Sequence, residues 1–189
     1  DSIAIDRLYM TDTRGRADTA AGDGGGGLVK GAAPVSVLRG GIRANRTAAT
    51  LSSQGGWLYA AAGGRVDATI VTSNTSGERG AGVYSGAALT LTNASVISNT
   101  LMAGGPTVDG AGVFVNGPIF ALYGSINENF IPGTNAGNEG GGAYVLGYAS
   151  IEQTEFGSNR VISGAGGGLY LAQGGVITSN LLFRNTARA

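Results

Sequence analysis

Three charged side chains, Arg79, Asp109 and Glu139, have a spacing that would let them act together. Each lies four residues before the apolar residue that closes a glycine-rich motif of the type GAGV or GGGA. If these motifs stack in register about 4.8 Å apart, Asp109 and Glu139 become neighbours, with Arg79 one level beyond. The same rule places Gln54 and Ala165 in this column.

Such a column supports three interpretations. Two carboxyl groups about 5 Å apart match the pair of a retaining glycosidase. They also suit a hard cation such as Ca²⁺ if loop carbonyls complete the ligand set, which makes Asp109 and Glu139 the calcium candidates. The third interpretation, which we favour, is a surface salt-bridge ladder contributing about 0–1 kcal/mol, in which Arg79 offsets the like charges.

Other catalytic chemistry is poorly provided for. The chain has no His and no Cys, which excludes a Ser-His-Asp triad, a thiol nucleophile and the usual zinc sites. We therefore expect no enzyme and no cofactor. The alternative is a polysaccharide lyase or glycoside hydrolase that uses Asp109, Glu139 and Arg79, with calcium as the one cofactor to consider.

Two repeated motifs must position these side chains. A glycine-rich motif recurs at 24–30, 55–60, 80–85, 110–115, 140–145 and 166–171, and an apolar-x-x-Asn motif ends at Asn45, Asn74, Asn99, Asn129, Asn159 and Asn185. From the apolar residue after the glycines to the Asn is 16 positions in five repeats, whereas the return arm varies between 9 and 14. A constant arm joined to a variable one is typical of stacked coils with one elastic loop.

A third short strand lies ten and eight positions before each Asn, as in Leu89/Leu91 and Ile119/Ala121. Its alternation of apolar and polar residues has the period of two that one buried face requires. The sequence thus predicts an all-β fold, a right-handed single-stranded parallel β-helix (β-solenoid) with about seven coils of three short strands. We expect a single domain over 1–189, with a partial first coil at 1–23 and repeats at 24–54, 55–79, 80–109, 110–139, 140–165 and 166–189.

The residues that follow the inward apolar positions are aromatic, and they form a predicted ladder of Tyr59, Tyr84, Phe114, Tyr144 and Tyr170. Exposed stacked rings suit sugar faces or lateral packing, so the ladder is the main predicted binding site. The alternative is that the rings are covered or stack only on one another.

The Asn column has a structural interpretation. Each side-chain amide can bond the coils above and below and satisfy turn backbone that the sheets leave free. Asn45, Asn74 and Asn93 also begin N-glycosylation sequons. For the two ladder residues we interpret the match as coincidence.

The composition limits the classes of partner that the protein is expected to bind. The formal net charge is zero, which removes the electrostatic attraction that dominates nucleic-acid binding. No apolar run approaches the roughly 20 residues of a membrane span. Hydrophobic residues make up 42% of the chain, which argues against disorder.

The paired motifs resemble the repeat of the polymorphic outer-membrane proteins and related surface passenger domains, which belong to the pectin-lyase-like superfamily. The resemblance is sharpest at Gly141–Tyr144 with Phe156–Asn159. It implies a non-enzymatic extracellular or cell-surface module for structure or adhesion, and the alternative is a β-helix that binds or cleaves polysaccharides. We expect self-association end to end, head-to-tail into filaments, or stacking on neighbouring coils of a longer chain. Glycans are the further partners to consider.

Overall fold

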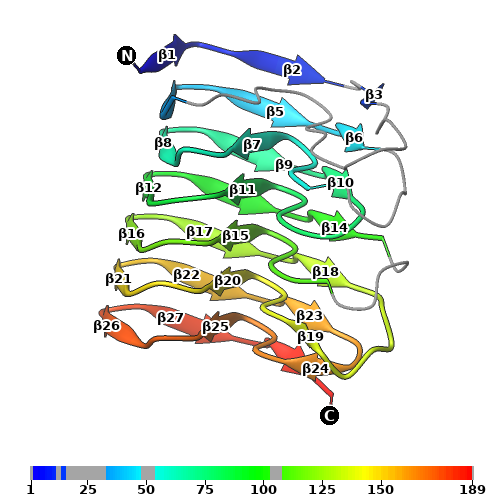
Figure 1. Ribbon diagram of the computed structural model, residues 1–189. Coiled ribbons are helices and arrows are strands. Elements are labelled where there is room, and N and C mark those ends of the chain that lie inside the picture. Colours follow the sequence, from blue (N-terminus) through cyan, green and yellow to red (C-terminus); the bar gives the residue numbers. More distant parts are fainter. Residues whose placement is uncertain (1, 12–13, 16–32, 48–53, 103–107, 189) are drawn as a thin grey trace.

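The computed structural model describes residues 2–11, 14–15, 33–47, 54–102 and 108–188. This part of the chain contains strands and turns without helix, and all the paired strands are parallel. Successive turns of the chain lie on one another as flat levels, with the two ends of the chain at opposite ends of the stack (Figure 1). The fold is a parallel β-solenoid, as the sequence predicted.

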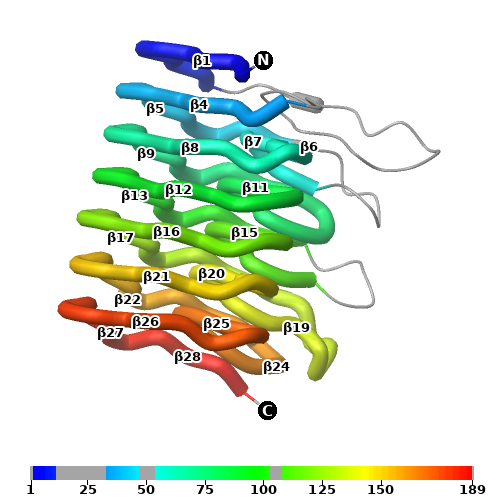
Figure 2. Tube along the Cα trace, turned by 60° about the vertical axis from the view of Figure 1, so that its left-hand side comes forward, coloured from blue at the N-terminus to red at the C-terminus, as the bar shows by residue number. Residues whose placement is uncertain are grey.

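Four main sheets run along the stack, three with seven strands and one with five, and each level adds at most one strand to each sheet (Figure 2). Sheet A contains β1 (Ile3–Asp6), β4 (Val35–Leu38), β8 (Gly64–Asp67), β12 (Leu89–Thr92), β16 (Ile119–Leu122), β21 (Ala149–Glu152) and β26 (Gly175–Thr178). Sheet B contains β2 (Tyr9–Thr11), β5 (Gly41–Arg43), β9 (Ile70–Thr72), β13 (Ser95–Ile97), β17 (Ser125–Asn127), β22 (Glu155–Gly157) and β27 (Leu181–Phe183).

The other two sheets close each turn. Sheet C contains β3 (Arg14–Gly15), β6 (Arg46–Thr47), β10 (Thr75–Ser76), β14 (Thr100–Leu101), β18 (Phe130–Ile131), β23 (Arg160–Val161) and β28 (Thr186–Ala187). Sheet D contains β7 (Leu58–Ala60), β11 (Val83–Ser85), β15 (Val113–Val115), β20 (Ala143–Val145) and β25 (Leu169–Leu171). A fifth, two-stranded sheet pairs β19 (Asn138–Glu139) with β24 (Gly164–Ala165).

The structure corrects the predicted numbers of strands and coils. A complete turn has four main strands rather than three, because the two residues after each ladder Asn form sheet C. These strands have only two residues each, and three of them bury one apolar side chain, Leu101, Ile131 or Val161, so they show no period of two in the sequence. Sheet D has five strands in the described residues, which gives about five complete turns instead of seven. The glycine-rich motif at 24–30 lies outside those residues.

The predicted inward positions form the core. Leu58, Val83, Val113 and Ala143 are paired level to level and fully buried. They pack with the inward residues of sheets A and B in one continuous cluster, which includes Phe156 and Ile126. A column spaced this closely leaves little room for water, so hydrophobic burial supplies most of the stability of the stack.

The glycine motif and the Asn motif are packing partners. A Cβ added at Gly112 would lie 2.5 Å from the carbonyl oxygen of Gly142 and 2.8 Å from Cγ of Asn129. Such distances are far inside van der Waals contact, so the strand reaches the Asn ladder only where it has no side chain. This contact explains why the two motifs recur together at a fixed separation.

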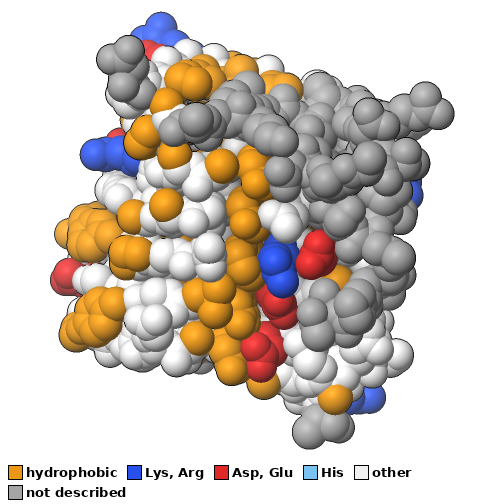
Figure 3. Space-filling model, in the orientation of Figure 1, with side chains coloured by type: hydrophobic (Ala, Val, Ile, Leu, Met, Phe, Trp, Pro, Cys, Tyr) orange, Lys and Arg blue, Asp and Glu red, His pale blue; other side chains and the backbone are white. Residues whose placement is uncertain are grey.

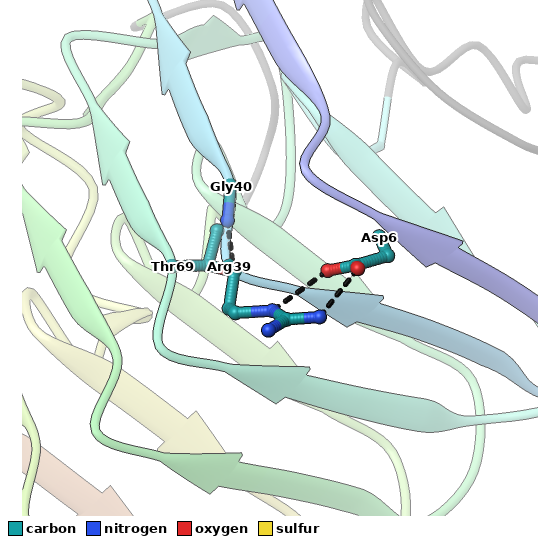
Figure 4. Close-up of polar contacts among 4 residues, drawn as sticks. All are labelled: Asp6, Arg39, Gly40 and Thr69. Carbon is teal, nitrogen blue, oxygen red and sulfur yellow. Dashed lines mark hydrogen bonds and ion pairs between the residues drawn. The ribbon is translucent and has the colours of Figure 1, made fainter.

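Contacts at the corner between sheets A and B also link one level to the next. Its residues at positive φ include Arg7, Arg39 and Tyr123. The Arg39 guanidinium donates two hydrogen bonds to the carboxylate of Asp6, and the backbone N–H of Gly40 donates to Oγ1 of Thr69 (Figure 4). The bond from Arg39 is the main cause that lowers the pKa of Asp6 from its ordinary value. The ion pair is exposed, so we assign it little weight in stability.

Candidate functional site

The structure brings the predicted charged column together. Gln54, Arg79, Asp109 and Glu139 are joined by parallel β-bridges in this order, and Glu139 continues the column to Ala165. The column runs along the corner that leads into sheet D. The arrangement therefore places Asp109 directly between Arg79 and Glu139, as the spacing predicted.

Arg79 takes part in several interactions at the centre of this column. Its guanidinium lies 3.7 Å from a carboxylate oxygen of Asp109 and 3.6 Å from one of Glu78. The same group stands over the ring of Phe114, 5.1 Å from the centroid, which is within the range of a cation–π contact. The only cation of the column is thus already engaged with two carboxylates and one ring.

Asp109 is the most buried carboxyl group of the site, with 7% of the residue exposed. Burial, which disfavours the charged form, is the largest cause of a rise in its pKa from 3.8 to about 6. The positive charge of Arg79 opposes this rise, and the negative charge of Glu139 adds to it. A carboxyl group with a pKa of about 6 changes its protonation state around that pH.

Glu139 is connected to the aromatic ladder. The hydroxyl of Tyr170 donates a hydrogen bond to its carboxylate, and the negative charge of Glu139 is the largest cause that raises the pKa of this tyrosine. The pKa of Tyr144 is raised too, first by burial and then by the charges of Asp109 and Glu139.

The ladder itself is stacked as predicted. Successive ring centroids from Tyr59 to Tyr170 are 4.8, 5.2, 5.3 and 5.1 Å apart, and neighbouring planes differ by 1° to 11°. The expectation of exposed rings holds only in part. Tyr59, Tyr84 and Phe114 are buried and form a cluster with Tyr144 and Leu146, while Tyr144 and Tyr170 are half-buried.

The charged column and the ladder line one hollow, which the sequence did not reveal because it treats them as separate columns. The hollow measures about 120 Å³ and is lined by Arg79, Tyr84, Asp109, Phe114, Asn116, Tyr144 and Leu146. On the surface, basic and acidic side chains lie directly beside a stripe of hydrophobic ones (Figure 3). This volume has room for a few water molecules or for one functional group of a ligand.

The donor set for a metal ion is limited. In the part of the chain that the structure describes, no three His, Cys, Asp or Glu side chains gather in a way that could hold an ion. Arg79 occupies the position beside Asp109 where a further oxygen ligand would be needed. Calcium binding by Asp109 and Glu139 thus stays a prediction without a third carboxylate to support it.

The Asn column connects the levels as expected. The side-chain amide of each ladder residue from Asn45 to Asn159 donates to Oδ1 of the next one at 2.9–3.0 Å. The backbone N–H of each donates to the same oxygen. Asn45 and Asn74 are fully buried, which leaves no access for glycosylation, whereas Asn93 is exposed.

Replacing Asp109 with asparagine should stabilise the protein at pH 8 and leave its stability at pH 4 unchanged. The folded-state pKa of Asp109 is raised, so its contribution is fully present below about pH 4 and is lost as the pH rises through about 6. A shift of this size corresponds to at most about 3 kcal/mol. Urea denaturation of both proteins at pH 4, 6 and 8 measures the difference.

The exposed Glu152 on sheet A provides the control. Its replacement with glutamine removes one carboxylate from the surface without changing the hollow. A gain for Asp109→Asn that is the same at pH 4 and pH 8 would contradict the assignment of the titration to Asp109.

Comparison with known proteins identifies no relative: no family model, curated protein or solved structure matches the chain. Within the described residues, no helix has the length and apolar character needed to cross a membrane.

Proposed function

We propose that this protein is a non-enzymatic structural or adhesive module of the cell surface or extracellular space, whose coils stack on further coils of a second copy or of a longer chain. The observation that carries the proposal is the last coil. Its inward-pointing Ile177 and Leu182 continue buried columns of the core and are nevertheless 40% and 53% exposed. A further level of the same geometry would cover them, whether it belongs to a second copy or to neighbouring coils of a longer chain.

A second copy of this chain offers that level at its first coil. Ile5 and Met10 begin the columns that end at Ile177 and Leu182. Stacking one copy on the next would continue the coil-to-coil packing in register, with apolar side chains on both surfaces. The contact is heterologous, so it extends into a filament rather than closing a ring.

The resemblance of the repeats to those of polymorphic outer-membrane proteins supports the surface location and the adhesive role. The charged column supports a non-enzymatic role as well. Arg79 is paired with Glu78 and Asp109, and Glu139 accepts a bond from Tyr170, so each of these charged groups already has a partner within the protein.

Replacing Leu182 with aspartate should abolish self-association. The carboxylate would be buried without a partner in the stacked interface, at a cost of several kcal/mol. Sedimentation velocity over a range of concentrations at neutral pH measures the change, with negative-stain electron microscopy to show filaments of the parent protein. In isolation the variant should keep its stability, because Leu182 is exposed.

Phe120→Asp is the matched control, because Phe120 is 44% exposed but lies on the outer face of sheet A. It should associate like the parent protein. A parent protein that stays monomeric at high concentration, or a control that also dissociates, would overturn end-to-end stacking.

A second candidate is a polysaccharide-binding or polysaccharide-cleaving protein. The observation in its favour is the hollow that Asp109, Arg79 and the rings of Tyr84, Phe114 and Tyr144 line together. Cleavage that the parent protein shows and that both Asp109→Asn and Glu139→Gln lose would establish this function. Cleavage that survives both changes would exclude these residues as the site.

A further inference from the structure

A second depression lies at a different corner of the solenoid, between sheets A and B. It measures about 440 Å³ and is lined by Tyr123, Gly124, Gln153, Thr154, Glu155, Ser179 and Leu181. None of these residues lines the hollow at Asp109. The volume falls within the range of 300–1,000 Å³ that is typical of small-molecule sites.

The register explains why the chain is grooved here. Tyr123, Gln153 and Ser179 occupy the same corner position on three successive levels, each at positive φ. The next position is small or buried, with Gly124 on one level and Thr154 on the level beyond it. Side chains that flank Gly124 and Thr154 in the sequence complete the lining of the groove.

Tyr123 has two features that packing does not explain. It is a bulky residue in the left-handed region, at φ 54°, and 56% of it is exposed. For a residue of this shape the backbone conformation costs roughly 1–2 kcal/mol. The other residues at this corner are Arg7, Arg39, Ala68, Asn93, Gln153 and Ser179, so an aromatic side chain is not a requirement of the turn.

The polar lining is suited to hydroxyl groups. Gln153 and Ser179 are exposed, and a side-chain amide or hydroxyl both donates and accepts hydrogen bonds. Glu155, the one charged side chain of the lining, already accepts a hydrogen bond from Nδ2 of Asn127. The groove therefore offers neutral donors and acceptors, and its one carboxylate is already engaged by a neighbouring amide.

We infer that this groove binds a neutral saccharide, with one face of a sugar ring on Tyr123 and the hydroxyl groups directed to Gln153 and Ser179. A pyranose has an apolar face and a rim of hydroxyls that both donate and accept, which matches the exposed ring beside the amide and the hydroxyl. This inference goes beyond the proposed stacking and does not depend on it.

The test is affinity electrophoresis in native gels that contain dextran, laminarin, galactomannan or xyloglucan, with polygalacturonate as the charged comparison. At least one neutral polymer should retard the parent protein. Tyr123→Ala should weaken that binding at least about tenfold, which corresponds to 1.4 kcal/mol, and Tyr123→Phe should retain it. Gln153→Ala, which alters an exposed side chain, should also weaken it.

Phe120→Ala removes a ring outside the groove that is 44% exposed, against 56% for Tyr123, and it should bind like the parent protein. The inference is overturned if no neutral polymer retards the protein, if only polygalacturonate does, or if Phe120→Ala weakens binding as much as Tyr123→Ala. Binding is measured at concentrations where sedimentation shows monomer, so a failure of end-to-end stacking leaves this test intact.

Discussion

Replacing Asn129 with alanine lowers the free energy of unfolding by about 3–5 kcal/mol. Asn129 lies in the middle of the Asn ladder and is fully buried. Its Oδ1 accepts bonds from the backbone N–H and from Nδ2 of Asn99, and its own Nδ2 donates to the carbonyl oxygen of Val96 and to Oδ1 of Asn159. Each buried polar group left without a partner costs about 1–3 kcal/mol.

The position in the ladder determines the size of the effect. Asn185 makes equivalent bonds to Asn159 and Phe156 but is only half-buried. Water can replace its amide at the exposed end of the stack, so Asn185→Ala should cost about 1 kcal/mol. Chemical denaturation of the two variants and the parent protein measures both values. Equal losses at the two positions would contradict the view that burial makes the ladder essential.

The second large effect is expected at Phe156. This side chain is fully buried and is the largest member of the inward column of sheet B, between Ile126 and Leu182. Its truncation to alanine removes a ring from a close-packed core that can relax only partly, at a cost of about 3–5 kcal/mol. Thermal denaturation and urea denaturation measure the loss of stability, with the same m-value used for the variant and the parent protein.

Leu182 is the matched comparison, because it belongs to the same column one level further on and is 53% exposed. Leu182→Ala should cost about 1 kcal/mol or less in the monomer. If Leu182→Ala proved as costly as Phe156→Ala in dilute solution, the last coil would be covered in the monomer, contrary to the structure.

The register of the solenoid could be predicted residue by residue. The 16-position arm aligned Leu58, Val83, Val113, Ala143 and Leu169, and these residues are paired in sheet D. The prediction succeeded because the glycine contact with the Asn ladder fixes this arm from both ends. A change in its length would move a side chain into the space that Gly112 or Gly142 leaves open.

Other features left no periodic pattern to read. The strands of sheet C are too short to show an alternation of buried and exposed residues. Tyr84 and Phe114 are buried in a cluster with Leu146, which lies outside their column. The groove at Tyr123 depends on a corner position that any of several residue types can occupy. Sequence spacing gave neighbours along a column. It could not show that two columns share a hollow.

The Asn ladder also bears on how the chain reaches this structure. Its side-chain bonds join residues that are 25 to 30 positions apart in the sequence. The entropy lost in closing a loop grows only with the logarithm of its length, so each coil closes at nearly the same cost wherever it lies. Folding can therefore begin at any pair of adjacent coils and spread in both directions, and a longer stack would not fold through more distant contacts than a shorter one.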